Sequence, residues 1–401
     1  MRKLFIDYTN CVPVKRAKVN GGSNYAQAVI LNIEKYLAEN EDIKNSVKVN
    51  ILWPEYYEPG TENEKNIYGS SQFGIIKVSR SIADFAYEDG DVLFLPLLGV
   101  SRFPVLEKLK RKKITLIVTV HGVRLLDLKW DKYDICYKRH MLPKQLVFFN
   151  NALLLPVKKL EYMRRLRKYL RCCDRLVTVS NYTLSRICSI ADMENVYLHL
   201  QYQDILHKKQ NASGQNNSSV KTNKYMLFVS GNREEKNLAR TLAAYVRSRR
   251  YSHEIADIII TGVHEKTKNA LVHNLKLREF TDNQKIRFLD YVDDDFLWKL
   301  YSGAEFLLYT SKSEGFGLPV LEAAFCGCPS VAAAGTSIPE VLEAAAFYVN
   351  PYSEESISRG ILWMSSDENR QAVKNRILKS MPLIKQKIKE SNDTLLDILL
   401  G

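Results

Sequence analysis

The sequence lacks the features of a disulfide-rich secreted protein and those of a membrane-spanning one. Its seven cysteines are odd in number and show no paired C-x-x-C spacing, so neither a disulfide framework nor a structural zinc site is indicated. No apolar run approaches the roughly 18 residues that a membrane span needs. The first residues, MRKLFIDYTN, hold only a three-residue apolar stretch before Asp7, which favours a β-strand over a secretion signal. We expect a reducing cytoplasm.

The composition is that of an ordinary globular protein with a surplus of positive charge. Hydrophobic residues make up 46% of the 401 residues, which excludes a disordered polymer, and the length favours two domains over one. Lysine and arginine number 58 against 45 acidic residues, a net charge of +13 that favours anionic partners. Acidic lipids and phosphate-bearing small molecules are anionic partners of this kind. No nucleic-acid partner is expected, because no recognised binding motif is present.

Short apolar runs, each followed by a loop and a segment with helical periodicity, alternate along the chain, which predicts parallel sheets covered on both faces. The predicted strands are residues 3–8, 47–53, 92–97, 114–120, 176–180, 196–200, 225–230, 257–262, 286–291, 305–310 and 330–333. A polar, Asn- and Ser-rich stretch at residues 208–224 interrupts the rhythm and is typical of a flexible linker. We therefore predict α/β domains at residues 1–207 and 225–371. A lysine-rich helix over residues 372–401 would be able to cross back to the N-terminal domain.

The segment 311–328 reads SKSEGFGLPVLEAAFCGC and follows a predicted buried strand. Its start therefore lies at the carboxyl edge of a parallel sheet, where ligands bind. Gly315 and Gly317 allow a positive φ and a close approach of ligand to backbone, and Pro319 suits the first turn of a helix. The N-terminus of such a helix is a ready site for phosphate.

Two glutamates flank this turn: Glu314 in the loop and Glu322, eight positions later, in the first turn of the predicted helix. A nucleotide sugar would offer its diphosphate to the turn and its hydroxyls to the carboxylates. A plainer interpretation has Glu322 complementing the helix dipole and Glu314 as a solvated loop charge. The spacing alone does not choose between them.

The residues from Glu314 to Pro319, followed by Glu322, resemble the E-x7-E motif of retaining glycosyltransferases of the GT-B fold, in glycosyltransferase family 4, or glycosyl transferases group 1. The resemblance implies two Rossmann-like domains whose parallel sheets face each other across a cleft. It also implies that Glu314 lies beside the donor sugar and that Glu322 binds the ribose. The main-chain amides that would meet the sugar hydroxyls are those of Gly315, Phe316, Gly317 and Leu318. Residues 335–341 and 347–351 resemble the same family.

The resemblance extends to the end of the first predicted strand of the second domain. Arg233 and Lys236 there resemble the family's diphosphate clamp, although the family's arginine commonly stands farther from the lysine. Fixed positive charge would stabilise a departing diphosphate. The alternative is a solvated turn that caps a helix beginning near Asn237. Val292, after the predicted strand 286–291, stands where the family cradles the nucleotide base.

In the N-terminal half, His121 follows the carboxyl end of a predicted strand and resembles the family's histidine near the donor sugar. The family often has aspartate next, where this chain has Gly122. A lone histidine is more often a structural residue, an alternative that stays open. Gly22, in the NGGSN segment of the first predicted strand-to-helix loop, resembles the family's glycine-rich acceptor-side loop and is counted among the residues that contact the nucleotide sugar.

Residues 293–295 contain a D-x-D pattern, which in another glycosyltransferase fold would suggest a manganese site. They directly precede the amphipathic run 296–301, where aspartates cap the start of a helix. The GT-B resemblance also implies a reaction without an essential metal. We expect no metal site, and no cofactor besides the nucleotide-sugar substrate.

The run from Lys158 to Arg175 contains eight basic residues against two acidic ones. Its apolar residues recur at helical spacing: Leu160, Met163, Leu166 and Leu170. One interpretation is an amphipathic helix whose basic face lies on anionic lipid at the inner face of a membrane. The other is an ordinary surface helix that packs its apolar stripe on the sheet.

The resemblance implies a metal-independent, retaining hexosyltransferase, which we expect to act in bacterial surface-polysaccharide synthesis. It would move a sugar from a UDP-, GDP- or dTDP-linked donor to a saccharide or a polyprenyl-diphosphate-linked acceptor. The expected catalytic residues are Glu314, His121, Lys236 and Arg233. The resemblance assigns no side-chain nucleophile, because in that family the departing phosphate takes the acceptor proton. Two alternatives are a non-catalytic relative that binds glycan or scaffolds a partner, and a sugar-nucleotide epimerase.

Overall fold

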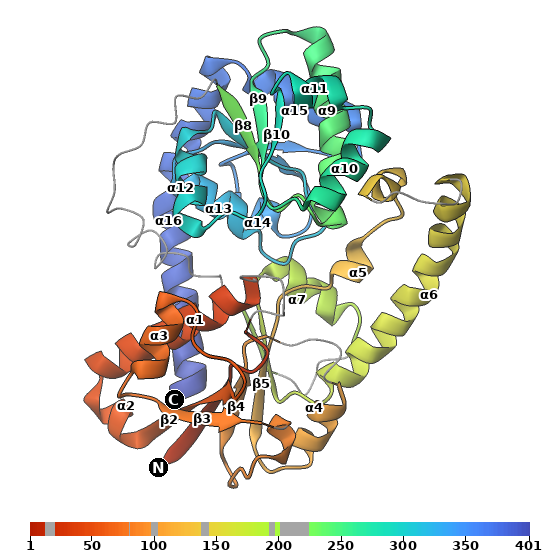
Figure 1. Cartoon of the computed structure of the whole chain (residues 1–401). Helices are drawn as coiled ribbons and strands as arrows, with labels where there is room; N and C mark the ends of the chain where they lie inside the picture. Colours follow the sequence, from red (N-terminus) through yellow and green to blue (C-terminus); the bar gives the residue numbers. More distant parts are fainter. Residues whose placement is uncertain (13–20, 80, 98–102, 138–143, 192–196, 201–223) are drawn as a thin grey trace. The chain divides into compact units, whose positions relative to one another are not determined.

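The computed structural model describes residues 1–12, 21–79, 81–97, 103–137, 144–191, 197–200 and 224–401 (Figure 1). The chain divides into two compact units, each built on one parallel sheet. Unit 1 comprises Met1–Val123, Leu160–Asp204 and Gln386–Gly401, and unit 2 comprises Arg124–Lys159 and Ile205–Lys385. The predicted linker, residues 208–224, lies outside the described residues except for Lys224.

Unit 1 contains a seven-stranded sheet in the order β3-β2-β1-β4-β5-β6-β7. Its strands are β1 (Arg2–Asp7), β2 (Val47–Pro54), β3 (Gly74–Val78), β4 (Val92–Leu95), β5 (Thr115–Val120), β6 (Arg175–Thr178) and β7 (Tyr197–Leu200). Its shorter helices are α1 (Gly21–Glu39), α2 (Glu41–Ser46), α3 (Glu62–Gly69), η1 (Ile82–Asp84), α4 (Phe103–Lys110) and α7 (Asn181–Cys188). The sequence prediction missed β3, because this strand pairs with β2 at the edge of the sheet and is only half-buried.

Unit 2 contains a six-stranded sheet in the order β10-β9-β8-β11-β12-β13. Its strands are β8 (Tyr225–Phe228), β9 (Asp257–Ile260), β10 (Ile286–Phe288), β11 (Phe306–Tyr309), β12 (Ser330–Ala333) and β13 (Phe347–Val349). Its shorter helices are α5 (Arg124–Asp127), η3 (Lys132–Tyr137), η4 (Glu234–Lys236), α9 (Leu238–Tyr251), α10 (Glu265–Asn274), α11 (Arg278–Asp282), α12 (Asp294–Gly303), α13 (Leu318–Phe325), α14 (Ile338–Leu342) and α15 (Glu354–Met364). The predicted parallel α/β architecture is confirmed.

The strand order of each sheet sets where a site forms. Every residue of β8, β9, β11 and β12 is buried, as a sheet covered on both faces requires. The order reverses between β1 and β4 in unit 1 and between β8 and β11 in unit 2. At such a point the connections after the two neighbouring strands leave in opposite directions, which opens a crevice at the carboxyl edge. The residues after β8 and β11 therefore lie at the switch point of unit 2.

Two long helices, α6 (Lys144–Leu170) and α16 (Asp367–Leu400), have residues in both units. The part of α16 from Gln386 onward belongs to unit 1. One hydrogen bond that holds it there runs from Arg175 Nη1 to the Ile398 carbonyl, at 3.4 Å. The basic helix predicted over residues 158–175 is shorter at its C-terminal end, because α6 ends at Leu170 and Arg175 is the first residue of β6. Among the described residues, no helix combines the length and apolarity needed to cross a bilayer.

The largest difference between the units and the predicted domains is the segment Arg124–Lys159. The prediction assigned residues 1–207 to the N-terminal domain, whereas Arg124–Lys159 packs with unit 2. The physical reason is a set of buried ion pairs that join this segment to α9 and to the loop after β11. The partners stand far apart in the sequence, so no local pattern announces the contact.

Candidate functional site

The loop between β11 and α13 lies at the carboxyl edge of the unit 2 sheet, as predicted. Gly317 caps α13 with φ of +105°, a backbone conformation that glycine adopts readily, and Pro319 stands in the first turn of the helix. Gly315 is not at positive φ, which corrects that part of the prediction. The loop therefore leads directly into α13, whose first N–H groups have no partner within the helix.

Lys236 and Glu314 form an ion pair at this edge. Lys236 closes η4, which follows β8, the neighbour of β11. Its Nζ lies 2.5 Å from Glu314 Oε1 and donates to the Tyr309 hydroxyl at 2.8 Å. The Lys236 side chain is 4% exposed and that of Glu314 is 13% exposed. The two predicted site residues, 78 positions apart, thus meet because the two strands that precede them are neighbours.

Burial and pairing act in opposite directions on the pKa values of this pair. Burial lowers the pKa of the Lys236 amine below its ordinary value, although the Glu314 carboxylate opposes the change. Burial by itself would raise the pKa of Glu314, but the Lys236 ammonium and hydrogen bonds from Ser311 and Tyr309 bring it below its ordinary value. Glu314 is therefore ionised at neutral pH and paired with a cation, which does not suit a general acid.

Two hydroxyl side chains hold the backbone of this loop. Ser337, which is fully buried, donates to the carbonyl oxygens of Glu314 at 3.1 Å and Phe316 at 2.8 Å. The Glu314 amide donates to Thr336 Oγ1 at 3.2 Å. The sequence prediction gave these two residues no role, although they lie in the segment 335–341 noted for its family resemblance. Their position directly before a helix with Pro339 in its first turn is the signal that was available.

Glu322 is the fifth residue of α13 and lies in its second turn, so its predicted place in the first turn is wrong, and so is the dipole interpretation. The side chain is buried, and the Tyr301 hydroxyl donates to its Oε2 at 3.0 Å. A buried carboxylate requires hydrogen-bond donors. The Tyr301 hydroxyl is one such donor to Glu322.

Arg233 and Val292 are less buried than Lys236. The Arg233 side chain is 54% exposed, and its Nη1 lies 3.5 Å from Glu235 Oε1. Val292 is half-buried and belongs to the connection between β10 and α12, because β10 ends at Phe288 rather than at residue 291. The helix predicted to begin near Asn237 is α9, which starts at the next residue.

The aspartates of the D-x-D pattern cap a helix, as predicted. Asp293 is the N-cap of α12, and its side chain accepts from the Phe296 amide at 2.8 Å. Within the described parts of the chain, no three His, Cys, Asp or Glu side chains gather into a group that could hold a metal ion.

His121 and Gly22 belong to unit 1. His121 Nε2 donates to the Pro96 carbonyl at 2.8 Å, and its ring meets the Tyr25 ring edge-on with centroids 4.7 Å apart. Burial lowers the pKa of His121, so the imidazole is neutral at pH 7. Gly22 lies in the first turn of α1, not in the predicted loop. A Cβ there would come within 2.5 Å of the Leu97 side chain, so glycine allows close packing beside the end of β4.

Comparison with known proteins matches residues 209–380 to the family described as Glycosyl transferases group 1. The chain is 33% identical over 145 residues to O-antigen chain mannosyltransferase B of Escherichia coli, covering 36% of this chain and 38% of that protein. It is 28% identical over 227 residues to O-antigen chain mannosyltransferase RfbU of Salmonella typhimurium, covering 55% of this chain and 58% of that protein. The chain thus matches less than two thirds of the length of these curated relatives.

Solved structures share the fold over the whole chain. Sucrose-phosphate synthase from Thermosynechococcus elongatus has a TM-score of 0.63 at 12% identity, with 98% of this chain and 99% of that chain covered. Anabaena HepE, solved in complex with UDP and glucose, has a TM-score of 0.60 at 13% identity, with 100% and 99% covered.

The fold is that of the GT-B glycosyltransferases, with one Rossmann-like parallel sheet in each unit. Within that fold, residues 209–380 match the family of glycosyl transferases group 1, and the matched part spans the unit 2 sheet and the loop around Glu314.

Proposed function

We propose that this chain is a retaining glycosyltransferase that uses a nucleotide sugar as donor and a saccharide or polyprenyl-diphosphate-linked saccharide as acceptor. The observation that supports this most is the buried ion pair of Lys236 and Glu314 at the unit 2 switch point, before the N-terminus of α13. A fixed cation and a helix N-terminus are what a departing diphosphate requires. A carboxylate beside that cation accepts hydroxyls from the attached sugar.

In this proposal, positive charge from the protein stabilises the leaving group without a metal ion. Lys236, with the more exposed Arg233, binds the diphosphate, and the amides of residues 315–318 meet the sugar hydroxyls. A phosphate that draws the Lys236 ammonium toward itself frees Glu314 Oε1 for a sugar hydroxyl. The departing phosphate takes the proton of the acceptor hydroxyl, so no side chain acts as nucleophile.

The remaining predicted residues bind and orient the donor. Glu322 accepts the ribose hydroxyls, as it accepts from Tyr301 in the structure. Val292 contacts the base, and Gly22 allows α1 to approach the donor closely. His121, neutral and oriented by its bond to Pro96, hydrogen-bonds a hydroxyl of the sugar.

The names of the curated relatives support mannose as the transferred sugar and an O-antigen type of polysaccharide as the product. The complex of the structural neighbour HepE with UDP and glucose supports a nucleotide-sugar donor. We propose accordingly that this chain acts in the synthesis of a bacterial surface polysaccharide.

A thermal-shift panel of UDP, GDP, dTDP and ADP sugars tests the proposal. A ligand at 100 times its Kd adds ~2.7 kcal/mol of stability, so one nucleotide class should raise the Tm. Lys236→Met should reduce transfer to a lipid-linked or free saccharide acceptor by about 10²–10³-fold. Lys268→Met is the matched control, because Lys268 lies on the surface and pairs only with the exposed Glu265 among the contacts described.

Different negative results in these binding and transfer assays favour different alternatives. Nucleotide binding without transfer to any acceptor would favour the non-catalytic relative. A new sugar nucleotide formed without acceptor would favour the epimerase. No stabilisation by any of the four nucleotide classes would refute the proposal, and an inverted anomeric centre in the NMR spectrum of the product would refute retention.

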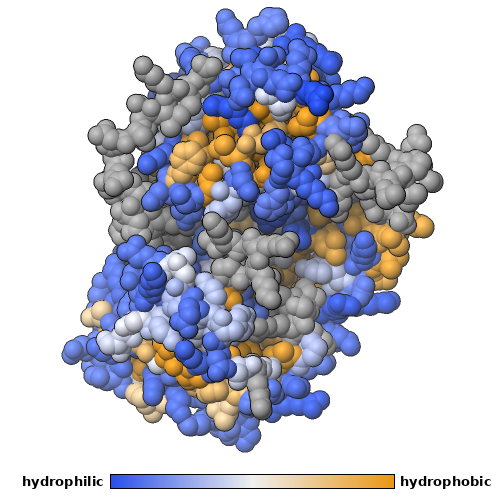
Figure 2. Space-filling view, in the orientation of Figure 1, coloured by the Kyte–Doolittle hydropathy of each residue, from blue (hydrophilic) through white to orange (hydrophobic). Residues whose placement is uncertain are grey.

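We also propose that α6 places the protein at the cytoplasmic face of an anionic membrane, where a lipid-linked acceptor is found. Of the predicted apolar stripe, Leu166 and Leu170 are buried, which fits the packing interpretation there. Toward the N-terminus, Leu153, Val157 and Leu160 share one helix face by their spacing and are 75%, 63% and 43% exposed. An apolar area at the right of Figure 2 lies over this part of α6.

Positive charge accompanies the exposed apolar face of α6. Lys158, Arg164 and Lys168 are exposed on the same helix. Apolar side chains that insert beside basic ones are the pattern of a helix that lies in the surface of an anionic bilayer.

Liposome co-sedimentation tests the membrane proposal. Leu153→Ser with Val157→Ser should reduce binding to vesicles rich in phosphatidylglycerol and leave the Tm unchanged, since both side chains are exposed. Leu378→Ser is the control, because Leu378 is 70% exposed but lies on α16. Wild-type binding that is equal on neutral vesicles, or insensitive to high salt, would defeat the proposal.

A further inference from the structure

The segment of residues 124–137, here called the strap, contains α5 and η3 and belongs to unit 2. It directly follows Val123, the last residue of the first stretch of unit 1. Neither the family match, which covers residues 209–380, nor the predicted site includes any strap residue. The contacts of the strap with the rest of unit 2 nevertheless reach the residues beside Glu314 and Lys236.

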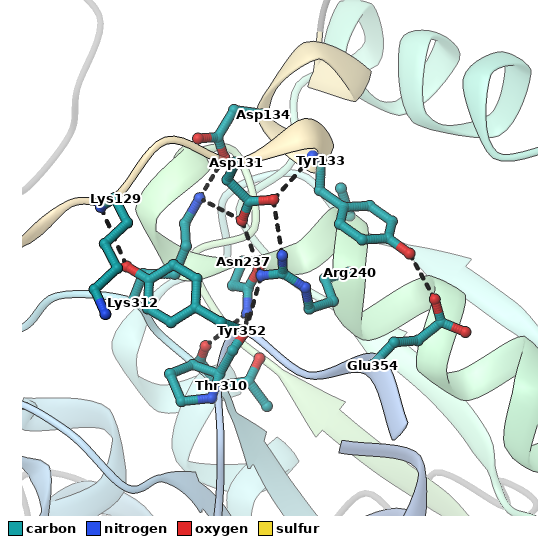
Figure 3. Close-up of polar contacts among 12 residues, drawn as sticks. Lys129, Asp131, Tyr133, Asp134, Asn237, Arg240, Thr310, Lys312, Tyr352 and Glu354 are labelled. Carbon is teal, nitrogen blue, oxygen red and sulfur yellow. Dashed lines mark hydrogen bonds and ion pairs between the residues drawn. The ribbon is translucent and has the colours of Figure 1, made fainter. Parts of the chain in front are cut away.

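Asp131 anchors the strap in the interior of unit 2 (Figure 3). Its carboxylate is fully buried and accepts two hydrogen bonds from the Arg240 guanidinium of α9, each of 2.8 Å. The same carboxylate lies 3.3 Å from the ammonium of Lys312, whose side chain is 1% exposed. Asp131 thus stands between two buried cations, one on a helix and one in the loop after β11.

Other contacts fix the strap on the side away from that loop. The Tyr133 hydroxyl donates to Glu354 Oε2 of α15 at 2.6 Å, and the Arg240 guanidinium lies 4.9 Å from the centre of the Tyr133 ring. The Tyr137 hydroxyl accepts from the Ala239 amide at 3.2 Å. These contacts would hold the strap in place even if its bonds to the loop were removed.

Three strap side chains meet the residues that precede the proposed diphosphate site. Asp134 is ion-paired with Lys312, and Ser313 Oγ donates to Asp127 Oδ2 at 3.1 Å. Arg124 Nη1 lies 2.7 Å from Oε1 of Glu235, the residue before Lys236. The loop and η4 are also joined directly, because the Lys312 amide donates to the Glu235 carbonyl at 2.8 Å.

We propose that the strap is a positioning element of the donor site: Asp127 and Asp134 hold Ser313 and Lys312 so that the next residue, Glu314, stays within bonding distance of Lys236. This inference rests on the proposed function. Displacement of a reacting group by a fraction of an ångström costs catalytic efficiency, so rigid support of the loop has a direct chemical consequence. Ser313 and Asp127 are positioning residues, since they act through Glu314.

The test uses variants that remove one hydrogen bond between strap and loop. Ser313→Ala and Asp127→Ala should each weaken nucleoside diphosphate binding and raise the donor KM by about three- to tenfold. The double variant should lose no more than either single variant, because both remove the same bond. Ser313→Thr keeps the hydroxyl and should restore wild-type affinity. The acceptor KM should not change in any of these variants.

Tyr133→Phe is the control for a purely structural role. It removes the hydroxyl bond to Glu354 but keeps the ring beside Arg240, so it should lower the Tm and leave the donor KM unchanged. Isothermal titration with UDP and GDP and thermal unfolding of the full chain are measured for each variant.

Wild-type donor affinity in both Ser313→Ala and Asp127→Ala would overturn the inference and leave the proposed function intact. An equal rise of donor KM in Tyr133→Phe would also overturn it, because the effect would then follow stability. If the wild-type chain binds none of the four nucleotide classes, the proposed function fails, and this inference fails with it.

Discussion

Replacement of Asp131 by asparagine tests whether the strap is an integral part of unit 2. The substitution keeps the size of the side chain and removes its charge. It leaves the buried cations of Arg240 and Lys312 with less than their full counter-charge, although Asp134 still faces Lys312. Breaking a buried ion pair on one side costs about 3–5 kcal/mol, because the remaining charge stays in a low-dielectric interior.

The loss should therefore be a large part of the stability of unit 2. Urea unfolding is followed by fluorescence, since three of the four tryptophans belong to unit 2, namely Trp130, Trp298 and Trp363. A loss of 3 kcal/mol lowers the midpoint by about 1 M at a slope of about 3 kcal/mol/M. Glu355→Gln is the control: its pair with Arg359 is exposed on α15, and an exposed pair contributes about 1 kcal/mol or less.

A double-mutant cycle separates the ion pair from general damage. Asp131→Asn combined with Arg240→Met removes the carboxylate and its bidentate partner together, so the combined cost should be less than the sum of the single costs. If Asp131→Asn costs no more than Glu355→Gln, the strap is not held by buried charge and the reasoning fails.

Three further results are expected. Lys236→Ala should reduce kcat by about 10²–10³-fold, because it removes a fixed charge that acts on the leaving group. Glu322→Ala should chiefly raise the donor Kd in titrations. Wild-type turnover and wild-type affinity in both variants would contradict these roles. Gly317→Ala places a side chain at φ of +105° and should cost about 1–3 kcal/mol in urea unfolding, and an unchanged midpoint would show that the loop relaxes freely. Burial, opposed by Lys312, raises the pKa of Asp134 from 3.8 to about 6. Between about pH 4 and about pH 6 the folded chain keeps a proton on Asp134 that the unfolded chain has lost, so the contribution of this residue to the free energy of unfolding falls as pH rises from about 4 to about 6. Asp134→Asn should remove that slope. Identical profiles of the free energy of unfolding against pH for the variant and the wild type would refute the assignment.

The sequence by itself determined the local features of this protein. Apolar runs that alternate with helical segments identified eleven of its strands, because a sheet buried on both faces needs continuous apolar strands. Pro319 placed the first turn of α13, because the ring of proline fixes a backbone angle that suits the start of a helix. The positions of Glu314 and Lys236 after predicted strands marked them as candidates, and the resemblance to the glycosyltransferase motifs assigned their roles.

Only the tertiary structure decided which charges meet. Asp131 pairs with Arg240 and Lys312 across 109 and 181 positions, and Glu322 meets a tyrosine of another helix. Periodicity records which side chains are buried but not which buried side chains face one another. That depends on strand order and on how helices and connections pack over the sheet, and these are settled by contacts between distant parts of the chain. The assignment of the strap to unit 2 and the second-turn position of Glu322 therefore became visible only in the folded protein.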